Sequence, residues 1–247
     1  MRATSTSGSA LSSDRRTRAL RAFALSLAIV GLPRVARAQG IVSGQISLVE
    51  RQRAEPSDLR SAVVYLEPIG KIVRTASTRP ELTETSIAMT DREFVPHVRV
   101  VQAGGSVTFP NRDPFSHNVF SNAEAGPFDL GLYRRGSSRT AHFPRPGIYP
   151  VYCNIHSRMV SFVVAVPEAN VATVASDGRF AIPDVPAGTY RLVAWHERAG
   201  ARVVHELTVP PTGLAGQRIV LDARAYVSGP HLNKFGLPYA ATRVDRY

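Results

Sequence analysis

The chain has 247 residues, of which 44% are hydrophobic and 20% charged, as in a folded globular protein. Its formal net charge is +11, but seven of the 30 basic residues and one of the 19 acidic residues lie in residues 1–38. The remaining 209 residues carry 23 basic and 18 acidic side chains, a net charge of +5 without any Lys/Arg run. This mild, scattered charge excludes a nucleic-acid-binding tract, and the length fits one large or two small domains.

The first 38 residues have the three regions of a secretory signal peptide. Arg15, Arg16, Arg18 and Arg21 precede an apolar run at 22–32, and Ala-Arg-Ala follows at 36–38. We therefore expect cleavage of residues 1–38 and export to the periplasm. The arginine pair loosely resembles a twin-arginine signal, so the Sec and twin-arginine routes both stay open. The apolar run is shorter than a membrane span, and no later segment is longer.

Short runs of alternating apolar and polar residues recur along the rest of the chain, separated by Gly- and Pro-containing turns. Such a pattern predicts an all-β protein built from β-sandwiches. The expected strands are 41–49, 62–66, 86–90, 98–101, 106–109, 118–120, 139–143, 148–153, 159–166, 171–175, 179–182, 189–195, 202–209 and 218–221.

A domain boundary is predicted near Pro167, between a first sandwich at 86–167 and a smaller second one at 168–224. Residues 39–85 are expected to pack on the first sandwich, because about 45 residues rarely form a core of their own. The tail, 225–247, contains Phe235, Tyr239 and Tyr247. We expect these aromatic residues to dock the tail into the seam between the sandwiches.

Cys153 is the only cysteine, so an internal disulfide is excluded. A single cysteine in an exported protein indicates intermolecular pairing, a reactive thiol or a metal ligand. The neighbouring residues favour a metal, because Cys153 is followed by His156 and Met159, and His117 lies 36 residues before it. Two imidazoles, a thiolate and a thioether are the ligand set of blue-copper sites, whereas thioether is a poor ligand for zinc.

The spacing of these residues fits one site. Cys153 is expected to end a strand, His156 and Met159 to lie on the short loop that follows, and His117 to come from a neighbouring strand end. Aromatic residues are expected to keep water away from the metal. They are Phe115, Phe120, Phe143, Tyr149 and Tyr152.

Residues 84–167 resemble the cupredoxins, most closely the amicyanin and plastocyanin group. The resemblance rests on Phe94-Val95-Pro96, Val101 to Gly105, Val107, Asn111-Arg112-Asp113, His117-Asn118-Val119, Gly147-x-Tyr149 and the C-x2-H-x2-M loop. It implies a Greek-key β-sandwich in which His117, Cys153 and His156 are the equatorial ligands and Met159 is the axial ligand of one type 1 copper ion. It also implies that Asn118 joins the two ligand-bearing loops and directs its backbone N–H at the Cys153 sulfur.

The second sandwich is similar to the Ig-like, carboxypeptidase regulatory-like domains. The matching residues are Asp177-Gly178-Arg179-Phe180, Val185-Pro186-Ala187-Gly188-Thr189-Tyr190 and Trp195-His196. The whole chain resembles exported proteins often labelled methylamine utilisation protein, which join these two kinds of domain.

The sequence favours an electron carrier over an enzyme. It contains no His-x-His pair, serine-hydrolase elbow, P-loop or paired acid motif, so no catalytic residue is expected. The expected function is transfer of single electrons through one type 1 copper, with a dehydrogenase or cytochrome as redox partner. Two alternatives remain open at this stage: a copper-handling or sensing protein, and an adhesion or carbohydrate-binding protein that works through its second sandwich.

Overall fold

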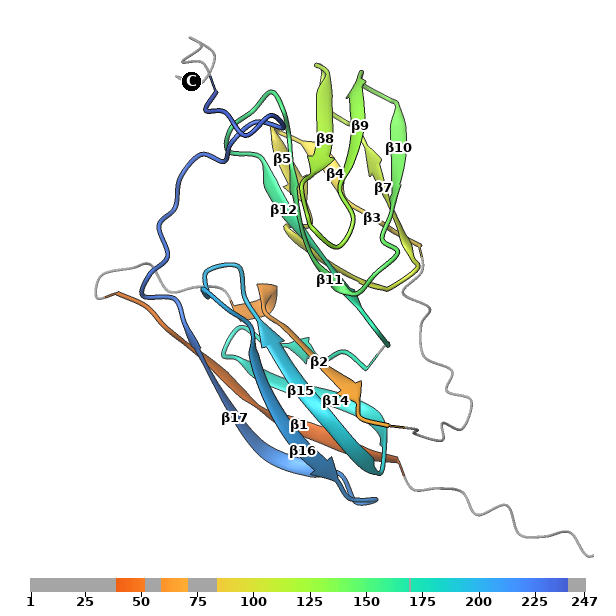
Figure 1. Cartoon of the computed structure of the whole chain (residues 1–247), viewed down its shortest axis with the longest axis vertical. Helices are drawn as coiled ribbons and strands as arrows, with labels where there is room; N and C mark the ends of the chain where they lie inside the picture. Colours follow the sequence, from red (N-terminus) through yellow and green to blue (C-terminus); the bar gives the residue numbers. More distant parts are fainter. Residues whose placement is uncertain (1–38, 52–58, 71–83, 169, 240–247) are drawn as a thin grey trace, which may run out of the picture. The chain divides into compact units, whose positions relative to one another are not determined.

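The computed structural model describes residues 39–51, 59–70, 84–168 and 170–239 (Figure 1). The predicted signal peptide and Tyr247 lie outside these residues. The described part consists of strands and one 3-10 turn, η1 (Leu59–Ser61), without any α-helix. It holds no helix of the length and hydropathy needed to cross a membrane. The predicted all-β, sandwich-type class is confirmed.

The first sandwich encloses its core between a mixed five-stranded sheet, β6-β12-β11-β8-β9, and a three-stranded sheet, β10-β7-β3; β4 and β5 form a separate hairpin. Phe109 from the smaller sheet and Tyr149 from the larger one belong to the same buried cluster. The strands are β3 (Glu84–Ser86), β4 (Ala88–Thr90), β5 (Glu93–Val95), β6 (Val98–Gln102), β7 (Ser106–Pro110), β8 (His117–Ser121), β9 (Phe128–Tyr133), β10 (Ser138–His142), β11 (Gly147–Tyr152) and β12 (Val160–Val166).

The second sandwich is built from the sheets β13-β14-β1-β17 and β16-β15-β2. Ile46 and Ile182 from the first sheet and Leu66 and Leu192 from the second belong to one buried cluster. The strands are β1 (Gln39–Val49), β2 (Val63–Pro68), β13 (Thr173–Val174), β14 (Arg179–Pro186), β15 (Gly188–Trp195), β16 (Val203–Val209) and β17 (Leu214–Asp222).

Strands β1 and β2 belong to the second sandwich and not, as expected, to the first. Strand β1 pairs antiparallel with β14 on one side and parallel with β17 on the other, and β2 pairs antiparallel with β15. Val42 and Ile46 of β1 fill the core of the second sandwich. Of the described residues in 39–85, only the short strand β3 pairs with the first sandwich, through β7. The first sandwich is therefore inserted in sequence between two parts of the second.

Strands β5 and β9 were not predicted. Strand β9 contains Gly131 within its sequence Phe-Asp-Leu-Gly-Leu-Tyr, and this glycine interrupts the alternation of apolar and polar residues. Gly131 has a φ of 68°, a conformation that favours glycine. Strand β5 has only three residues and ends directly before Pro96, which gives too short a pattern to recognise.

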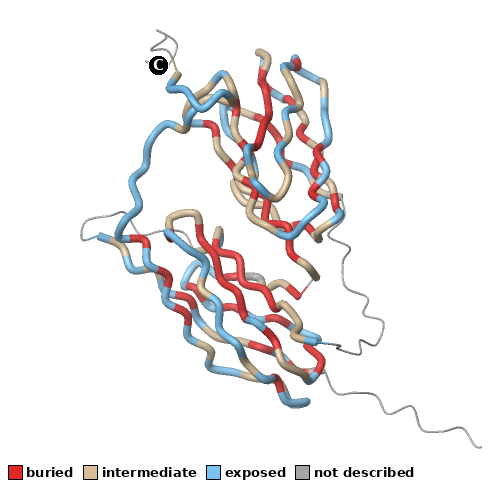
Figure 2. Tube along the Cα trace, in the orientation of Figure 1, coloured by how far each residue is buried: buried red, intermediate tan, exposed pale blue. Residues whose placement is uncertain are grey.

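Strand β8 is buried at all five of its positions (Figure 2). It lies between β11 and β9 in the five-stranded sheet. Tyr152, the last residue of β11, pairs with Phe120 of β8, so the end of β11 lies beside β8. This pairing brings the two parts of the predicted metal site together.

Candidate metal centre

The fold brings His117, Cys153 and His156 into one buried cluster. His117 is the first residue of β8, Cys153 follows the last residue of β11, and His156 lies on the loop 153–159 that leads to β12. We call residues 153–159 the ligand loop. The side chains of His117 and Cys153 are fully buried, and His156 is half-buried. Among the described residues, this is the one group of three or more His, Cys, Asp or Glu side chains with metal-binding spacing.

The distances in the cluster match those that a metal ion requires. The Cys153 Sγ lies 3.6 Å from Nδ1 of His117 and 3.6 Å from Nδ1 of His156. A metal bonded to sulfur at about 2.3 Å and to nitrogen at about 2.0–2.1 Å separates these atoms by roughly 3.5–3.8 Å at trigonal to tetrahedral angles. The three donor atoms all lie within 4.8 Å of one another. The cluster therefore has the dimensions of a coordination site.

Met159 closes the ligand loop. It is only 2% exposed and belongs to the same buried cluster as Cys153. The Cys153 N–H donates to the Met159 carbonyl (3.3 Å), and the Met159 N–H donates to the His156 carbonyl (3.1 Å). These bonds bring the two ends of the loop together, while the thioether as fourth ligand stays a prediction.

Asp113 fixes the orientation of His117. The Nε2 atom of His117 lies 2.7 Å from Oδ2 of Asp113, which leaves Nδ1 directed at the sulfur. Burial lowers the pKa of His117, although the Asp113 carboxylate opposes this effect. Burial alone raises the pKa of Asp113, but hydrogen bonds from Arg92 N–H, His117 and Asp91 N–H bring it below its usual value. A neutral His117 that donates from Nε2 presents a free Nδ1 lone pair to a metal.

Cys153 is protected from water and surrounded by backbone donors. Burial raises the pKa of its thiol, and the backbone N–H groups of His156, Ile155 and Asn118 act in the opposite direction by hydrogen-bonding to the side chain. The expected backbone contact from Asn118 is thus present. A buried thiol becomes a thiolate ligand when a cation replaces its proton.

The side chain of Asn118 does not join the two ligand-bearing loops as expected. Its Nδ2 group donates to Oδ1 of Asp129 at 2.6 Å, so it connects β8 to β9. Strand β9, which the sequence did not predict, pairs with β8 and supplies the Asp129 carboxylate beside Asn118. The Asn118 side chain therefore bonds to β9.

Of the five aromatic residues expected around the site, Phe115 contacts both imidazoles. Its ring centroid lies 5.1 Å from that of His117 and 5.6 Å from that of His156. Phe143 and Tyr149 pack edge to face in the same buried cluster as Cys153. Phe120 and Tyr152 instead pack against each other and against His231 of the C-terminal tail. These contacts bury Tyr152, and burial raises the pKa of its hydroxyl.

The contact between His231 and these rings was not predicted. The tail was expected in the seam between the sandwiches, whereas His231, Lys234 and Tyr239 contact the ligand loop. The expected seam is occupied by other residues, because Phe162 from β12 packs against Trp195 from β15 with ring centroids 5.2 Å apart. Phe235 does not dock there and remains 74% exposed.

The remaining histidines of the two sandwiches lie outside the cluster. His97 forms a 2.8 Å ion pair with Glu197, and His196 lies 3.0 Å from the Ser61 hydroxyl. His142 lies 3.4 Å from the hydroxyl of Ser106, and His205 is exposed.

Comparison with solved structures finds copper proteins over part of the chain. A purple cupredoxin from Nitrosopumilus maritimus is 21% identical, with a TM-score of 0.30 over 33% of this chain and 99% of its own. Amicyanin from Paracoccus versutus is 17% identical, with a TM-score of 0.32 over 36% of this chain and 86% of its own.

A copper-containing nitrite reductase from Thermus scotoductus is 20% identical, with a TM-score of 0.32, and matches 49% of this chain and 28% of its own. No protein-family model and no curated protein matches the chain.

Proposed function

We propose that this chain is an exported type 1 copper protein that carries single electrons, with His117, Cys153, His156 and Met159 as the ligands of one copper ion. The observation that carries the proposal is the buried His-Cys-His cluster with two N···S separations of 3.6 Å. Two imidazoles and one thiolate in a compact buried group fit copper, and a thioether as fourth donor favours copper over zinc.

Copper bound in such a site cycles between Cu(II) and Cu(I) and so supplies one-electron transfer. The residues of the chain hold and shield it. Asp113 orients the His117 ring, and Phe115 covers the two imidazoles. Four protein ligands leave no open position for a substrate, which favours a carrier over an enzyme.

The partner is then a second redox protein, such as a dehydrogenase or cytochrome. The predicted signal peptide supports a periplasmic location. We assign the second sandwich to the carboxypeptidase regulatory-like type on its sequence resemblance, now with β1 and β2 as part of it.

A copper titration of the full chain tests the metal assignment. The wild-type protein should bind one copper ion per chain in competition with a chelator, and Cys153→Ser should weaken this binding strongly because the thiolate is lost. His205→Asn is the matched control, since His205 is exposed and distant in sequence from the ligands. Equal copper binding by the wild-type and Cys153→Ser proteins would show that the cluster is not the site.

A further inference from the structure

The ligand loop is covered by residues 231–239, which we call the C-terminal segment. Residues 224–230 before it are exposed, and the chain then becomes partly buried again at His231. Figure 1 shows this segment, in dark blue, beside the loop that joins β11 to β12. A terminus that is not tied down is usually frayed, so a segment that regains contact after an exposed stretch requires specific interactions.

Two hydrogen bonds and one further polar contact run from the segment to carbonyl groups of the ligand loop. The Tyr239 hydroxyl donates to the Cys153 carbonyl at 2.6 Å. The His231 N–H donates to the Ser157 carbonyl at 2.9 Å, and its Nε2 lies 3.2 Å from the His156 carbonyl. The segment thus contacts the backbone of both ligands that the loop contributes to the cluster.

Lys234 attaches the same segment at a second place. Its backbone N–H donates to Oδ1 of Asn154 at 2.9 Å, and its ammonium group lies 2.6 Å from Oδ2 of Asp129. The other oxygen of Asp129 accepts the bond from Asn118, the residue after the ligand His117. The segment is therefore connected to both ligand-bearing parts of the site.

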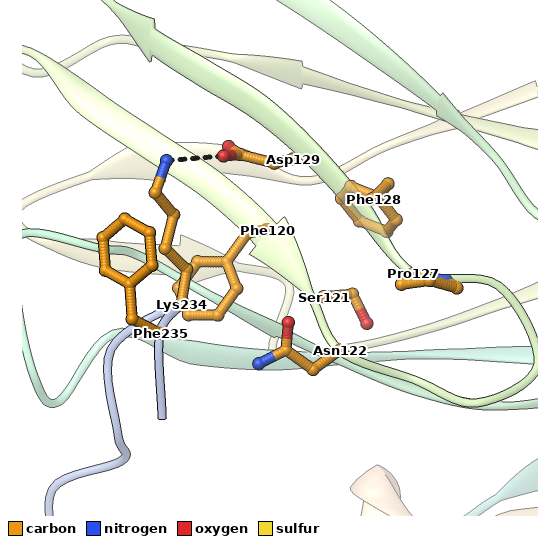
Figure 3. A pocket seen from close by; sticks show the side chains of 8 residues that line it. All are labelled: Phe120, Ser121, Asn122, Pro127, Phe128, Asp129, Lys234 and Phe235. Carbon is orange, nitrogen blue, oxygen red and sulfur yellow. Dashed lines mark hydrogen bonds and ion pairs between the residues drawn. The ribbon is translucent and has the colours of Figure 1, made fainter. Parts of the chain in front are cut away.

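The ion pair between Lys234 and Asp129 lies at a shallow pocket of about 400 Å³, where Phe120 and Phe235 also line the wall (Figure 3). Because the one ammonium group at the pocket is already paired with a carboxylate, we interpret the pocket as the junction between segment and sandwich.

The segment has a defined internal shape. Oδ1 of Asn233 accepts hydrogen bonds from the N–H groups of Phe235 (2.9 Å) and Leu237 (3.1 Å). The Asn233 N–H donates to the Leu237 carbonyl, and Gly236 has a φ of 76°. An asparagine that bonds its own downstream backbone, with glycine at positive φ, makes a compact turn. This turn sets the distance between His231 and Tyr239.

His231 adds a packing contact to its hydrogen bonds. Its ring stacks on Tyr152 with centroids 4.4 Å apart and an interplanar angle of 29°. Tyr152 is the residue directly before Cys153, so the stack lies at the start of the ligand loop.

We propose that the C-terminal segment is a positioning clamp for the ligand loop, with Tyr239 and His231 as its positioning residues. One backbone bond of the loop, from Cys153 to Met159 at 3.3 Å, joins its two ends, and a second, from Met159 to His156 at 3.1 Å, closes its second half. The segment adds two hydrogen bonds, from Tyr239 and from the His231 N–H, and the His231 Nε2 contact, and so restricts the movement of Cys153 and His156. The effect on copper rests on the proposed function, whereas the effect on the loop does not.

The test compares full-length Tyr239→Phe, a chain ending at Pro230 and the control Tyr226→Phe. Tyr226 lies in the same tail but outside the segment, so the control removes an equivalent hydroxyl. The first readout is amide hydrogen exchange of the metal-free protein. We expect faster exchange at 154–159 in Tyr239→Phe and in the shortened chain, with unchanged exchange in β15 and in the control.

The second readout is the rate of copper release to a chelator. Loss of one hydrogen bond corresponds to roughly a three- to tenfold change. We expect an acceleration of about this size for Tyr239→Phe, a larger one for the shortened chain and none for Tyr226→Phe. Altered ligand geometry should also shift the visible absorption of the copper-loaded variants.

Unchanged loop exchange in Tyr239→Phe would overturn the clamp, as would faster exchange spread evenly over the whole chain. If the shortened chain fails to fold, the hydrogen exchange of Tyr239→Phe decides by itself whether the segment restrains the ligand loop. If the wild-type protein binds no copper but loop exchange still rises in Tyr239→Phe, the clamp stands and the proposed function falls. The two proposals can therefore fail separately.

Discussion

At the level of single residues, the site depends on how each donor atom is oriented. His117 is held at both ring nitrogens, with Asp113 at Nε2 and the Cys153 sulfur beside Nδ1. Asp113 is itself held by the N–H groups of Asp91 and Arg92, at 2.6 and 3.0 Å. Partners of this kind fix the tautomer of a ligating histidine and raise its affinity for metal.

Replacement of Asp113 by Asn should weaken copper binding by about 10- to 100-fold. In one orientation the Asn amide would direct an N–H group at Nε2 and so favour the His117 tautomer that carries its proton on Nδ1. In the other orientation it would lack an acceptor for one of the N–H groups of Asp91 and Arg92. Chelator competition measures the affinity. The exposed Asp184→Asn is the control and should bind copper like the wild-type protein. An unchanged affinity in Asp113→Asn would contradict the role given to Asp113.

Replacement of Met159 by Leu should keep the protein coloured and raise its reduction potential. The equatorial ligands hold the metal, and the loss of a weak axial donor destabilises Cu(II) more than Cu(I). Cyclic voltammetry measures the potential. A lower potential, or a protein that no longer binds copper, would remove Met159 from its proposed axial position.

The residues of the candidate cluster could be predicted because four side chains that are able to bind a metal, three of which the structure brings together, stand in an ordered pattern. The contacts of Asp129, His231 and Tyr239 could not. Each of them depends on a partner far away in sequence, from 11 residues for Asn118 and Asp129 to 86 residues for Tyr239 and Cys153. The order of residues within a short stretch does not indicate which distant residues it will contact in the folded protein.

At the level of elements, an alternating pattern predicts a strand but does not identify its neighbours. Residues 41–49 were correctly expected in a strand, and β1 covers them. Its partners β14 and β17 follow more than 100 residues later, after the inserted sandwich. The expected packing of β1 on the nearer domain was wrong for this reason.

Replacement of Gly44 by Ala tests the position of β1. A β-carbon on Gly44 would overlap the carbonyl group of Gln217 in β17, because the two strands approach closely there. We expect a loss of at least about 1–3 kcal/mol in the free energy of unfolding, measured by urea denaturation. Gly200→Ala is the control, since a β-carbon there meets nothing within 4 Å. Equal stability of the two variants would argue against the β1–β17 pairing.

At the level of the whole molecule, the two sandwiches share a third hydrophobic cluster. Val63 and Val193 come from the sheet of β2 and β15, and Val164 and Val166 come from β12. The ion pair between His97 and Glu197 joins residues of the same two sandwiches. The inserted sandwich and the sandwich that surrounds it in sequence therefore share both buried apolar contacts and an ion pair.

This ion pair makes stability depend on pH. The hydrogen bond with Glu197 raises the pKa of His97, so its contribution is complete below the usual value of about 6.5 and is lost as pH rises through the raised pKa. Burial raises the pKa of Glu197, but the hydrogen bond with His97 outweighs this effect, so the pKa of Glu197 lies below its usual value. Glu197 is therefore protonated, and the ion pair lost, only in more acidic solution. The pair should therefore stabilise most at mildly acidic pH.

Urea denaturation of the wild-type protein and His97→Gln at about pH 5.5 and pH 8.5 measures this effect. The wild-type protein should be the more stable of the two at the lower pH, and the difference should shrink at the higher pH. A difference that grows with pH would have the wrong sign for this ion pair.

The visible absorption spectrum of the full chain loaded with Cu(II) tests the central claim most directly. We predict an intense band from the Cys153 thiolate bound to Cu(II), which one equivalent of a one-electron reductant removes and an oxidant restores. The band should be absent from Cys153→Ser. A protein that holds copper without this band, or a band that persists in Cys153→Ser, would contradict the account.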